Sequence, residues 1–212
     1  MIPRVLHQIW VGGPIPARLQ MLIDTWRPLH PDWEYRLWTE DDLAGWLTNR
    51  DLFDNAARYT ASTGQFRADV ARYEILHAHG GVYVDVDFEA RRPLDPLCTV
   101  PAWAAWEVDG RWVNNAILGA VPGHPFFADL IDGLPHSVAR NPGRRPNVMT
   151  GPQYVTPFAR RWQQRGSLVI HPARMFYPYL HDELERAGDD FPDAWAVHHW
   201  DNARRRAGVV DA

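Results

Sequence analysis

The sequence contains no lysine, because all 22 of its basic residues are arginine. Arginine must therefore carry every cationic role, and a lysine nucleophile or Schiff base is excluded. The single cysteine, Cys98, excludes an intramolecular disulfide framework. The sequence shows no basic start followed by an apolar signal segment, and no apolar run approaches the roughly 20 residues that span a bilayer. We therefore expect a cytoplasmic protein without a transmembrane segment.

Charge and length narrow the class of partner. The net charge is −4 and like charges do not cluster in runs, which argues against nucleic acid as a partner. A chain of 212 residues fits one domain that is large enough to bury a rigid site. Tryptophan occurs 11 times, and indole rings stack well on nucleobases and on sugar faces. A small-molecule ligand is the partner class that these features leave open.

Apolar periodicity alternates between strand and helix along the chain. This alternation predicts an α/β sandwich with a mainly parallel sheet. We expect one domain over residues 1–203 and a flexible tail over residues 204–212. The predicted strands cover residues 4–11, 35–38, 81–84, 103–108, 112–119, 168–170 and 194–200. The predicted helices cover residues 16–29, 63–79, 125–134, 152–164 and 180–187, with a further capped start at Thr39, and residues 135–146 are expected to form an exposed loop.

Two acids, Asp85 and Asp87, directly follow the short apolar run at residues 81–84. Extended backbone would turn both carboxylates to one side, at the carboxyl end of a strand where open α/β sheets bind ligands. Two carboxylates this close repel each other, and a divalent cation relieves that repulsion. Oxygen ligands favour Mg²⁺ or Mn²⁺. The alternative is that the two acids only cap a turn.

The helix before this pair carries Asp69 and Arg72, which lie three residues apart on one helical face. They could contact a ligand directly, or they could form an ordinary ion pair within the helix. Tyr83 points to the opposite face of its strand from Val82 and Val84, so it either packs in the core or directs its hydroxyl at the ligand.

Three stretches together resemble a known family. The residues Arg67-Ala68-Asp69-Val70-Ala71-Arg72-Tyr73-Glu74-Ile75-Leu76, followed by Gly80-Gly81-Val82-Tyr83-Val84-Asp85-Val86-Asp87, resemble the DXD-containing sugar-binding region of glycosyltransferase family 32. Yeast initiation-specific mannosyltransferases and the catalytic domains of clostridial large glucosylating toxins share this arrangement. The opening stretch, residues 2–13, and the segments 114–118, 123–126, 150–152 and 198–200 are also similar to the family, so the resemblance covers most of the chain.

The resemblance implies a GT-A-type fold and a nucleotide-diphosphate sugar as donor, with a UDP-sugar favoured and GDP-mannose possible. It implies that Trp10 stacks on the nucleobase, and that the donor is bound by the residues Gln8, Asp69, Arg72, Tyr83 and Asp85. It further implies that Asp85 and Asp87 bind Mn²⁺ or Mg²⁺, and that these two acids together with Arg72 are the catalytic residues.

The closing motif departs from the family. A serine and a tryptophan usually follow it, whereas Asp201-Asn202-Ala203-Arg204 stands here, which puts the third metal ligand in doubt. Of the two adjacent histidines, we choose His199 over His198 as that ligand. Ala68 also replaces a serine that often precedes the helix aspartate, so one hydrogen bond to the donor is expected to be missing.

We therefore expect a metal-dependent, retaining transferase that moves a hexose to a hydroxyl acceptor. The acceptor stays unidentified, and Glu107, Asp109 and Asn114 are candidate residues on its side, in the loops at 107–115 and 135–150 that would shape its pocket. No pair of carboxylates suited to a covalent glycosyl intermediate is evident. A nucleotide-sugar hydrolase and a non-catalytic sugar- or nucleotide-binding protein are the alternatives.

Overall fold

The computed structural model describes residues 1–209. Its strands are β1 (Val5–Ile9), β2 (Glu34–Trp38), β3 (Gly81–Val84), β4 (Phe88–Ala90), β5 (Ala102–Val108), β6 (Trp112–Ala120), β7 (Val169–His171) and β8 (Ala196–His198). Its α-helices are α1 (Ala17–Asp24), α2 (Trp26–Leu29), α3 (Glu40–Leu43), α4 (Arg50–Asp54), α5 (Thr63–His79), α6 (Pro125–Arg140), α7 (Pro146–Met149), α8 (Pro152–Gln164) and α9 (Asp201–Arg206). Short 3₁₀ helices cover Ala56–Arg58, Asp95–Thr99, Ala173–Met175 and Leu184–Gly188.

A six-stranded sheet with the order β2-β1-β3-β6-β5-β7 forms the centre of the molecule. The pairings β1–β2, β1–β3 and β5–β7 are parallel, whereas β3–β6 and β5–β6 are antiparallel. The predicted mainly parallel α/β sandwich is therefore confirmed. Strands β4 and β8 form a separate antiparallel pair, which joins the segment after β3 to the C-terminal part of the chain.

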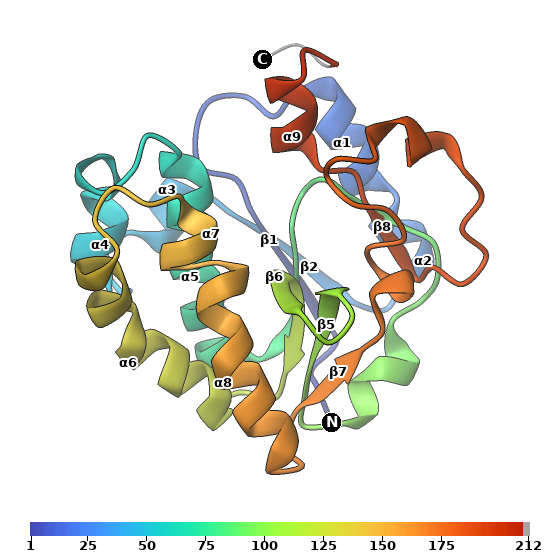
Figure 1. Ribbon diagram of the computed structural model, residues 1–212. Helices are drawn as coiled ribbons and strands as arrows, with labels where there is room; N and C mark the ends of the chain where they lie inside the picture. The colour runs from blue at the N-terminus through green and yellow to red at the C-terminus, as the bar shows by residue number, and fades with distance from the viewer. Residues whose placement is uncertain (210–212) are drawn as a thin grey trace.

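Two apolar layers enclose the central sheet. Figure 1 shows α5, α6 and α8 on one side of the strands and α1, α2 and β8 on the other. Alternation along β3 divides its side chains between the two layers: Tyr83 packs in the core with α5 and α6, while Val82 and Val84 pack in the opposite core with Trp26. The predicted orientation of Tyr83 is thus confirmed, and its ring is buried at 1% exposure.

Two glycines allow α5 to turn directly into β3. Gly80 and Gly81 have φ angles of 64° and 89°, which L-residues with side chains rarely adopt. A Cβ atom at Gly80 would lie 2.6 Å from Pro122, and one at Gly81 would lie 2.6 Å from the carbonyl oxygen of Val5. The pair of glycines therefore lets β3 start beside β1 and places the residues after Val84 at the carboxyl edge of the sheet.

Three elements differ from the sequence-based expectation. Helix α6 continues through Arg140, so the predicted loop at 135–146 is wrong for its first six residues. Burial of Leu134 and Val138 continues the apolar face past Pro135, and two such side chains together outweigh the roughly 3 kcal/mol cost of an internal proline.

The C-terminal region holds the other two differences. The predicted helix at 180–187 is instead a 3₁₀ helix at Leu184–Gly188. Residues 204–206 of the predicted tail belong to α9, and residues 210–212 lie outside the described residues. Within the described chain, every helix is too short or too polar to cross a bilayer.

Candidate active site

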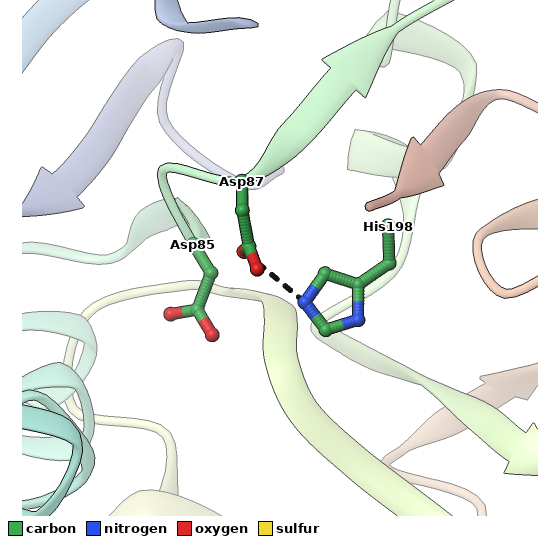
Figure 2. A group of neighbouring side chains, drawn as sticks. All are labelled: Asp85, Asp87 and His198. Carbon is green, nitrogen blue, oxygen red and sulfur yellow. Dashed lines mark hydrogen bonds and ion pairs between the residues drawn. The ribbon is translucent and has the colours of Figure 1, made fainter. Parts of the chain in front are cut away.

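Asp85 and Asp87 lie in the turn between β3 and β4, at the carboxyl edge of the central sheet. The backbone N–H of Phe88 donates to the carbonyl oxygen of Asp85 at 3.2 Å, which closes the turn. The expected convergence of the two carboxylates is therefore present, but its cause differs from the prediction. A tight turn, rather than the alternation of an extended strand, brings the side chains together (Figure 2).

Side chains from α5 and β3 contact the carboxylate of Asp85. The Tyr83 hydroxyl donates to Oδ1 of Asp85 at 2.5 Å, and the guanidinium of Arg72 lies 3.2 Å from the same oxygen. The guanidinium carbon of Arg72 also stands 4.6 Å from the centroid of the Tyr83 ring. These contacts fix the rotamer of Asp85 and leave its side chain 26% exposed, which makes it the most accessible acid of the turn.

The carboxylate of Asp87 is held from the C-terminal part of the chain. Nε2 of His198, the last residue of β8, lies 3.1 Å from Oδ1 of Asp87. The backbone N–H of Asp201, at the start of α9, donates to Oδ2 at 2.8 Å. Residues more than 100 positions away in the sequence thus orient this acid, because β4 pairs with β8.

The structure brings His198, not the predicted His199, to the two acids. Single ligand atoms of Asp85, Asp87 and His198 all lie within 4.8 Å of one another, and we call these residues the acidic cluster. The ring of His199 instead places Nε2 2.9 Å from Glu89 and Nδ1 3.3 Å from the hydroxyl of Tyr179. His199 directly follows β8, where alternation turns its side chain away from that of His198, so this geometry favours His198 over the predicted His199.

Burial and charge act differently on the two acids. Burial raises the pKa of Asp85, and the charge of Asp87 adds to this effect, although Arg72 opposes both. Burial also opposes ionisation of Asp87, but the charge and hydrogen bond of His198 outweigh it and lower the pKa of Asp87. Burial would lower the pKa of His198, yet the charge and hydrogen bond of Asp87, with the charges of Asp85 and Glu107, together outweigh burial and raise it. Asp87 and His198 therefore form an ion pair, while Asp85 is the acid that a further cation would help to ionise.

A second group of polar side chains, from α5, β6 and the segment after α7, contacts Asp85 through Arg72, and we call it the closed network. Its members are each at most 3% exposed: Asp69, Arg72, Tyr73, Asn115 and Thr150. Asp69 accepts hydrogen bonds from Asn115 at 2.8 Å and Thr150 at 2.7 Å and pairs with Arg72 at 3.0 Å. Burial raises the pKa of Asp69 to about 6.

Asp69 and Arg72 form the ion pair that one interpretation of their spacing expected, and their contact with a ligand stays a prediction. The two residues do form an ion pair within α5, but Arg72 also reaches Asp85, and its Nη1 donates to the carbonyl oxygen of Asn115 at 2.8 Å. Sequence reasoning missed Asn115 and Thr150, although both lie in segments that resemble the family. The closed network therefore positions Asp85 through the contact with Arg72.

The two candidates from β1 lie at the same edge of the sheet. Gln8 is fully buried, accepts a hydrogen bond from Tyr35 at 2.7 Å, and directs its amide towards the carbonyl oxygen of Asp85 at 3.4 Å. Trp10 follows β1 directly, is partly exposed, and donates from its indole to the carbonyl oxygen of Gly13 at 2.7 Å. Because β1 and β3 are parallel neighbours, Trp10 and the acidic cluster share one edge.

The acceptor-side candidates Glu107, Asp109 and Asn114 all belong to the β5–β6 hairpin, but their contacts differ. Glu107 accepts a hydrogen bond from the side chain of Asn114 at 2.8 Å, and burial raises the pKa of Glu107. The charge of His198 acts on Glu107 as well, which places Glu107 on the side of the acidic cluster. Asp109 instead accepts from the backbone N–H of Ala173 at 2.8 Å and is exposed.

The acidic cluster fits a divalent cation. It offers two carboxylates, the ligands that Mn²⁺ and Mg²⁺ prefer, and one imidazole beside them. The ring nitrogen of His198 that faces the acids is Nε2, 3.1 Å from Asp87 (Figure 2), and a cation in the cluster would take the place of the proton that the ion pair holds there.

Comparison with known proteins finds a family that matches the part of the chain containing Asp85 and Asp87. Residues 16–102 match the family described as "Glycosyltransferase sugar-binding region containing DXD motif". Inositol phosphoceramide mannosyltransferase 3 of Schizosaccharomyces pombe is 29% identical over 222 residues, and the match covers 94% of this chain and 60% of that protein. The chain thus spans about three fifths of the length of this relative. The resemblance inferred from the sequence is confirmed.

Solved structures agree on the fold. The PaToxG glycosyltransferase superposes with a TM-score of 0.60 at 13% identity, covering 77% of this chain and 69% of that one. The galactosyltransferase LgtC, solved with donor and acceptor sugar analogs, gives a TM-score of 0.52 at 13% identity and covers 98% and 96% of the two chains. The predicted GT-A-type fold is therefore confirmed.

Proposed function

We propose that this chain is a metal-dependent glycosyltransferase that moves a hexose from a nucleotide-diphosphate sugar to a hydroxyl acceptor. The observation that carries the proposal is the convergence of Asp85, Asp87 and His198 within 4.8 Å at the carboxyl edge of a GT-A-type sheet. The match to a DXD-containing sugar-binding region over residues 16–102 supports it.

The chain's own residues divide the work between positioning and binding. Arg72 and Tyr83 hold Asp85 from one side, and His198 with the N–H of Asp201 holds Asp87 from the other. A divalent cation bound by these acids would stabilise the negative charge that develops on the departing nucleotide diphosphate. Trp10 at the same edge provides an indole face for the nucleobase.

We propose that transfer retains the anomeric configuration, with attack and departure on the same face of the sugar. Retention by double displacement would need a second carboxylate about 5 Å from the acid partner, at the sugar's anomeric carbon. Asp85 and Asp87 are instead committed to the acidic cluster, and Glu107 is bonded to Asn114. Proton NMR of the first product formed reports its anomer, and a trapped covalent glycosyl-enzyme would rule out this mechanism.

The donor is tested most directly by thermal stability. Ligands that bind the native state raise its melting temperature, so a panel of UDP- and GDP-sugars with and without Mn²⁺ identifies the donor. We expect a UDP-sugar or GDP-mannose to raise the melting temperature only when Mn²⁺ is present. Equal shifts with and without Mn²⁺ would contradict a metal-dependent donor site.

Two further measurements separate the alternatives. A nucleotide-sugar hydrolase would turn over the donor at the same rate with and without an acceptor, whereas a transferase is accelerated by the acceptor. A non-catalytic binding protein would retain ligand affinity in Asp85→Asn and Asp87→Asn. The name of the fission-yeast relative makes a phosphorylated inositol headgroup the first acceptor chemistry to test.

A further inference from the structure

Asp201 is a buried acid that belongs neither to the acidic cluster nor to the closed network. It is the first residue of α9 and is 7% exposed. The sequence departs from the resembled family in this stretch, since Asp201-Asn202-Ala203-Arg204 stands where a serine and a tryptophan usually follow. The role of Asp201 therefore has to follow from its contacts in this chain.

The main chain and the side chain of Asp201 have different partners. Its backbone N–H donates to Oδ2 of Asp87 at 2.8 Å. Its carboxylate instead binds two arginines: Nη2 of Arg18 forms an ion pair with Oδ1, and Nε of Arg205 donates to Oδ2 at 2.7 Å. Because both carboxylate oxygens are bound by arginine, Asp201 contacts the acidic cluster only through its N–H.

The two arginines belong to different elements. Arg205 lies on α9 itself, four residues after Asp201, so that ion pair stays within one helix. Arg18 lies on α1, near the other end of the chain. Figure 1 shows α9 beside α1, and the ion pair between Arg18 and Asp201 joins the two helices. Arg18 therefore fixes the position of α9 relative to the rest of the fold, which Arg205 cannot do.

The turn between β8 and α9 is strained. Trp200 has φ 53° and ψ 48°, and it is the only residue other than glycine with a positive φ in the described part of the chain. This left-handed turn lets Nε2 of His198 lie at Oδ1 of Asp87 while the N–H of Asp201 reaches Oδ2 of the same carboxylate. Both contacts with Asp87 thus depend on the conformation of Trp200.

A strained conformation of this kind persists only where the surrounding contacts enforce it. On one side the indole of Trp200 donates to the carbonyl oxygen of Tyr179 at 3.0 Å. On the other side the next residue, Asp201, is anchored to α1 by Arg18. Loss of the Arg18 anchor would allow the turn to relax and would withdraw the N–H of Asp201 from Asp87.

The guanidinium of Arg18 also lies within electrostatic reach of the acidic cluster. Burial and the charge of Arg204 lower the pKa of Arg18, whereas the charge of Asp87 raises it. A direct contact between Arg18 and the diphosphate of a donor is therefore the competing role. The ion pair with Asp201 already occupies this guanidinium, and it favours a role in positioning.

We propose that Arg18 is a positioning residue for the acidic cluster, and that its ion pair with Asp201 fixes the start of α9 so that Asp87 keeps the orientation that binds a divalent cation. This inference rests on the proposed metal-dependent function. Arg18 acts through Asp201 and Asp87, and it contacts neither the cation nor the donor.

The direct test measures Mn²⁺ binding to the full chain, without donor, by titration of free Mn²⁺ with electron paramagnetic resonance. Arg18→Gln removes the charge that joins α9 to α1, and Arg205→Gln removes the other partner of the same carboxylate. We expect Mn²⁺ binding to weaken at least about fivefold in Arg18→Gln and less than about twofold in Arg205→Gln. Arg18→Lys, which keeps a positive charge, should bind Mn²⁺ more tightly than Arg18→Gln. Equal affinities in Arg18→Gln and Arg205→Gln would overturn the proposal.

A double-mutant cycle tests whether Arg18 acts through Asp201. Asp201→Asn keeps the backbone N–H and the size of the side chain but loses the ion pair. If the effect passes through Asp201, Arg18→Gln/Asp201→Asn should bind Mn²⁺ no more weakly than Asp201→Asn alone. Effects that multiply would show a separate route and overturn the proposal. If Arg18→Gln does not fold, as its melting temperature reports, parent-like Mn²⁺ binding by Asp201→Asn overturns the proposal by itself.

Donor affinity separates positioning from direct contact. At saturating Mn²⁺ the melting-temperature shift produced by a nucleotide sugar reports donor binding, and Arg18→Gln should keep the donor affinity of the parent within about twofold. Weaker donor binding with unchanged Mn²⁺ affinity would make Arg18 a residue that contacts the donor, which contradicts the proposal.

Failure of this inference and failure of the proposed function are distinguishable. A parent that binds neither Mn²⁺ nor a nucleotide sugar loses the proposed function. A parent that binds both, but whose Mn²⁺ affinity is equally insensitive to Arg18→Gln and Arg205→Gln, keeps the proposed function and loses the role of Arg18.

Discussion

The closed network and the acidic cluster touch each other through one contact, from Arg72 to Asp85 at 3.2 Å, yet they are satisfied to different degrees. In the closed network Asp69 has three partners and each partner is buried. In the acidic cluster Asp85 is bound by Tyr83 and Arg72 but stays 26% exposed, and Nδ1 of His198 has no partner in the described part of the chain. The difference indicates that ligand-binding groups are left partly unpaired, while the groups behind them are locked in place.

The largest expected effect comes from a substitution in the closed network. Asp69→Ala leaves Arg72 with one acid instead of two, and it removes one of the two acceptors that Asn115 and Thr150 each have. Removing one partner from a buried charged network costs about 3–5 kcal/mol of unfolding free energy. Urea denaturation followed by circular dichroism measures this loss.

Asp85→Ala, a substitution in the acidic cluster, is the matched control. Its side chain is 26% exposed, and Arg72 keeps Asp69 as a partner when it is removed. We expect a loss of about 1–2 kcal/mol, because the buried Tyr83 hydroxyl loses its acceptor. Equal losses in the two variants would mean that the acidic cluster is as structural as the network behind it.

The second effect concerns the acidic cluster and catalysis. Asp87→Asn keeps the shape of the side chain, and its amide oxygen can still accept from the N–H of Asp201. The charge that faces the cation is lost, so the transfer rate should fall about 10²–10³-fold, and loss of the ion pair with His198 should lower the free energy of unfolding as well. Initial rates of nucleotide release at saturating Mn²⁺ measure this fall. Asp54→Asn, an exposed acid paired with Arg50, serves as the control and should keep the full rate.

The comparison also shows which parts of the site a sequence can predict. Helix α5, its two terminal glycines and the buried strand β3 have strong local signals, so the place of Asp85 and Asp87 follows from the sequence. The partners that complete the site come from distant elements: Asn115 from β6 and Thr150 from the segment after α7 bond to Asp69, and His198 from β8 bonds to Asp87. Only the pairing of β4 with β8 decides between two adjacent histidines, and no local pattern reports that pairing.

Secondary structure failed where local signals and burial disagree. Pro135 reads as a helix breaker, yet the buried positions Leu134 and Val138 keep α6 helical around it. The stretch at 180–187 has apolar spacing typical of a helix but forms only one short 3₁₀ segment. In both places tertiary packing, which the sequence does not show directly, overrides local propensity.

The third effect sharpens the choice between the two histidines. Because His198 lies 3.1 Å from Asp87 within the acidic cluster, His198→Gln should weaken Mn²⁺ binding at least about tenfold. His199→Gln removes a ring that contacts Glu89 and Tyr179, so it should weaken Mn²⁺ binding less than about threefold. Titration of free Mn²⁺ by electron paramagnetic resonance in the presence of a nucleotide diphosphate measures both. The reverse order would restore His199 as the ligand.

The smallest effect compares His198 with His7, a buried histidine that is fully satisfied. Nε2 of His7 lies 2.9 Å from the carbonyl oxygen of Gly80, and its Nδ1 accepts from the indole of Trp38 at 3.1 Å. Burial lowers the pKa of His7 to about 4, so between pH 6.5 and 4 the unfolded chain binds a proton at this residue that the folded chain does not. The stability that His7 contributes is therefore complete above pH 6.5 and is lost as the pH falls towards 4.

This linkage amounts to about 1 kcal/mol between pH 6.5 and 5.5. Urea midpoints of the parent should fall over this range more steeply than those of His7→Gln, since glutamine does not titrate. The difference between the two proteins isolates His7 from His198, whose raised pKa acts with the opposite sign in both. Parallel pH profiles would show that the ring of His7 takes up its proton in the folded state as readily as in the unfolded chain. The packing around His7 would then be less rigid than its hydrogen bonds to Gly80 and Trp38 indicate.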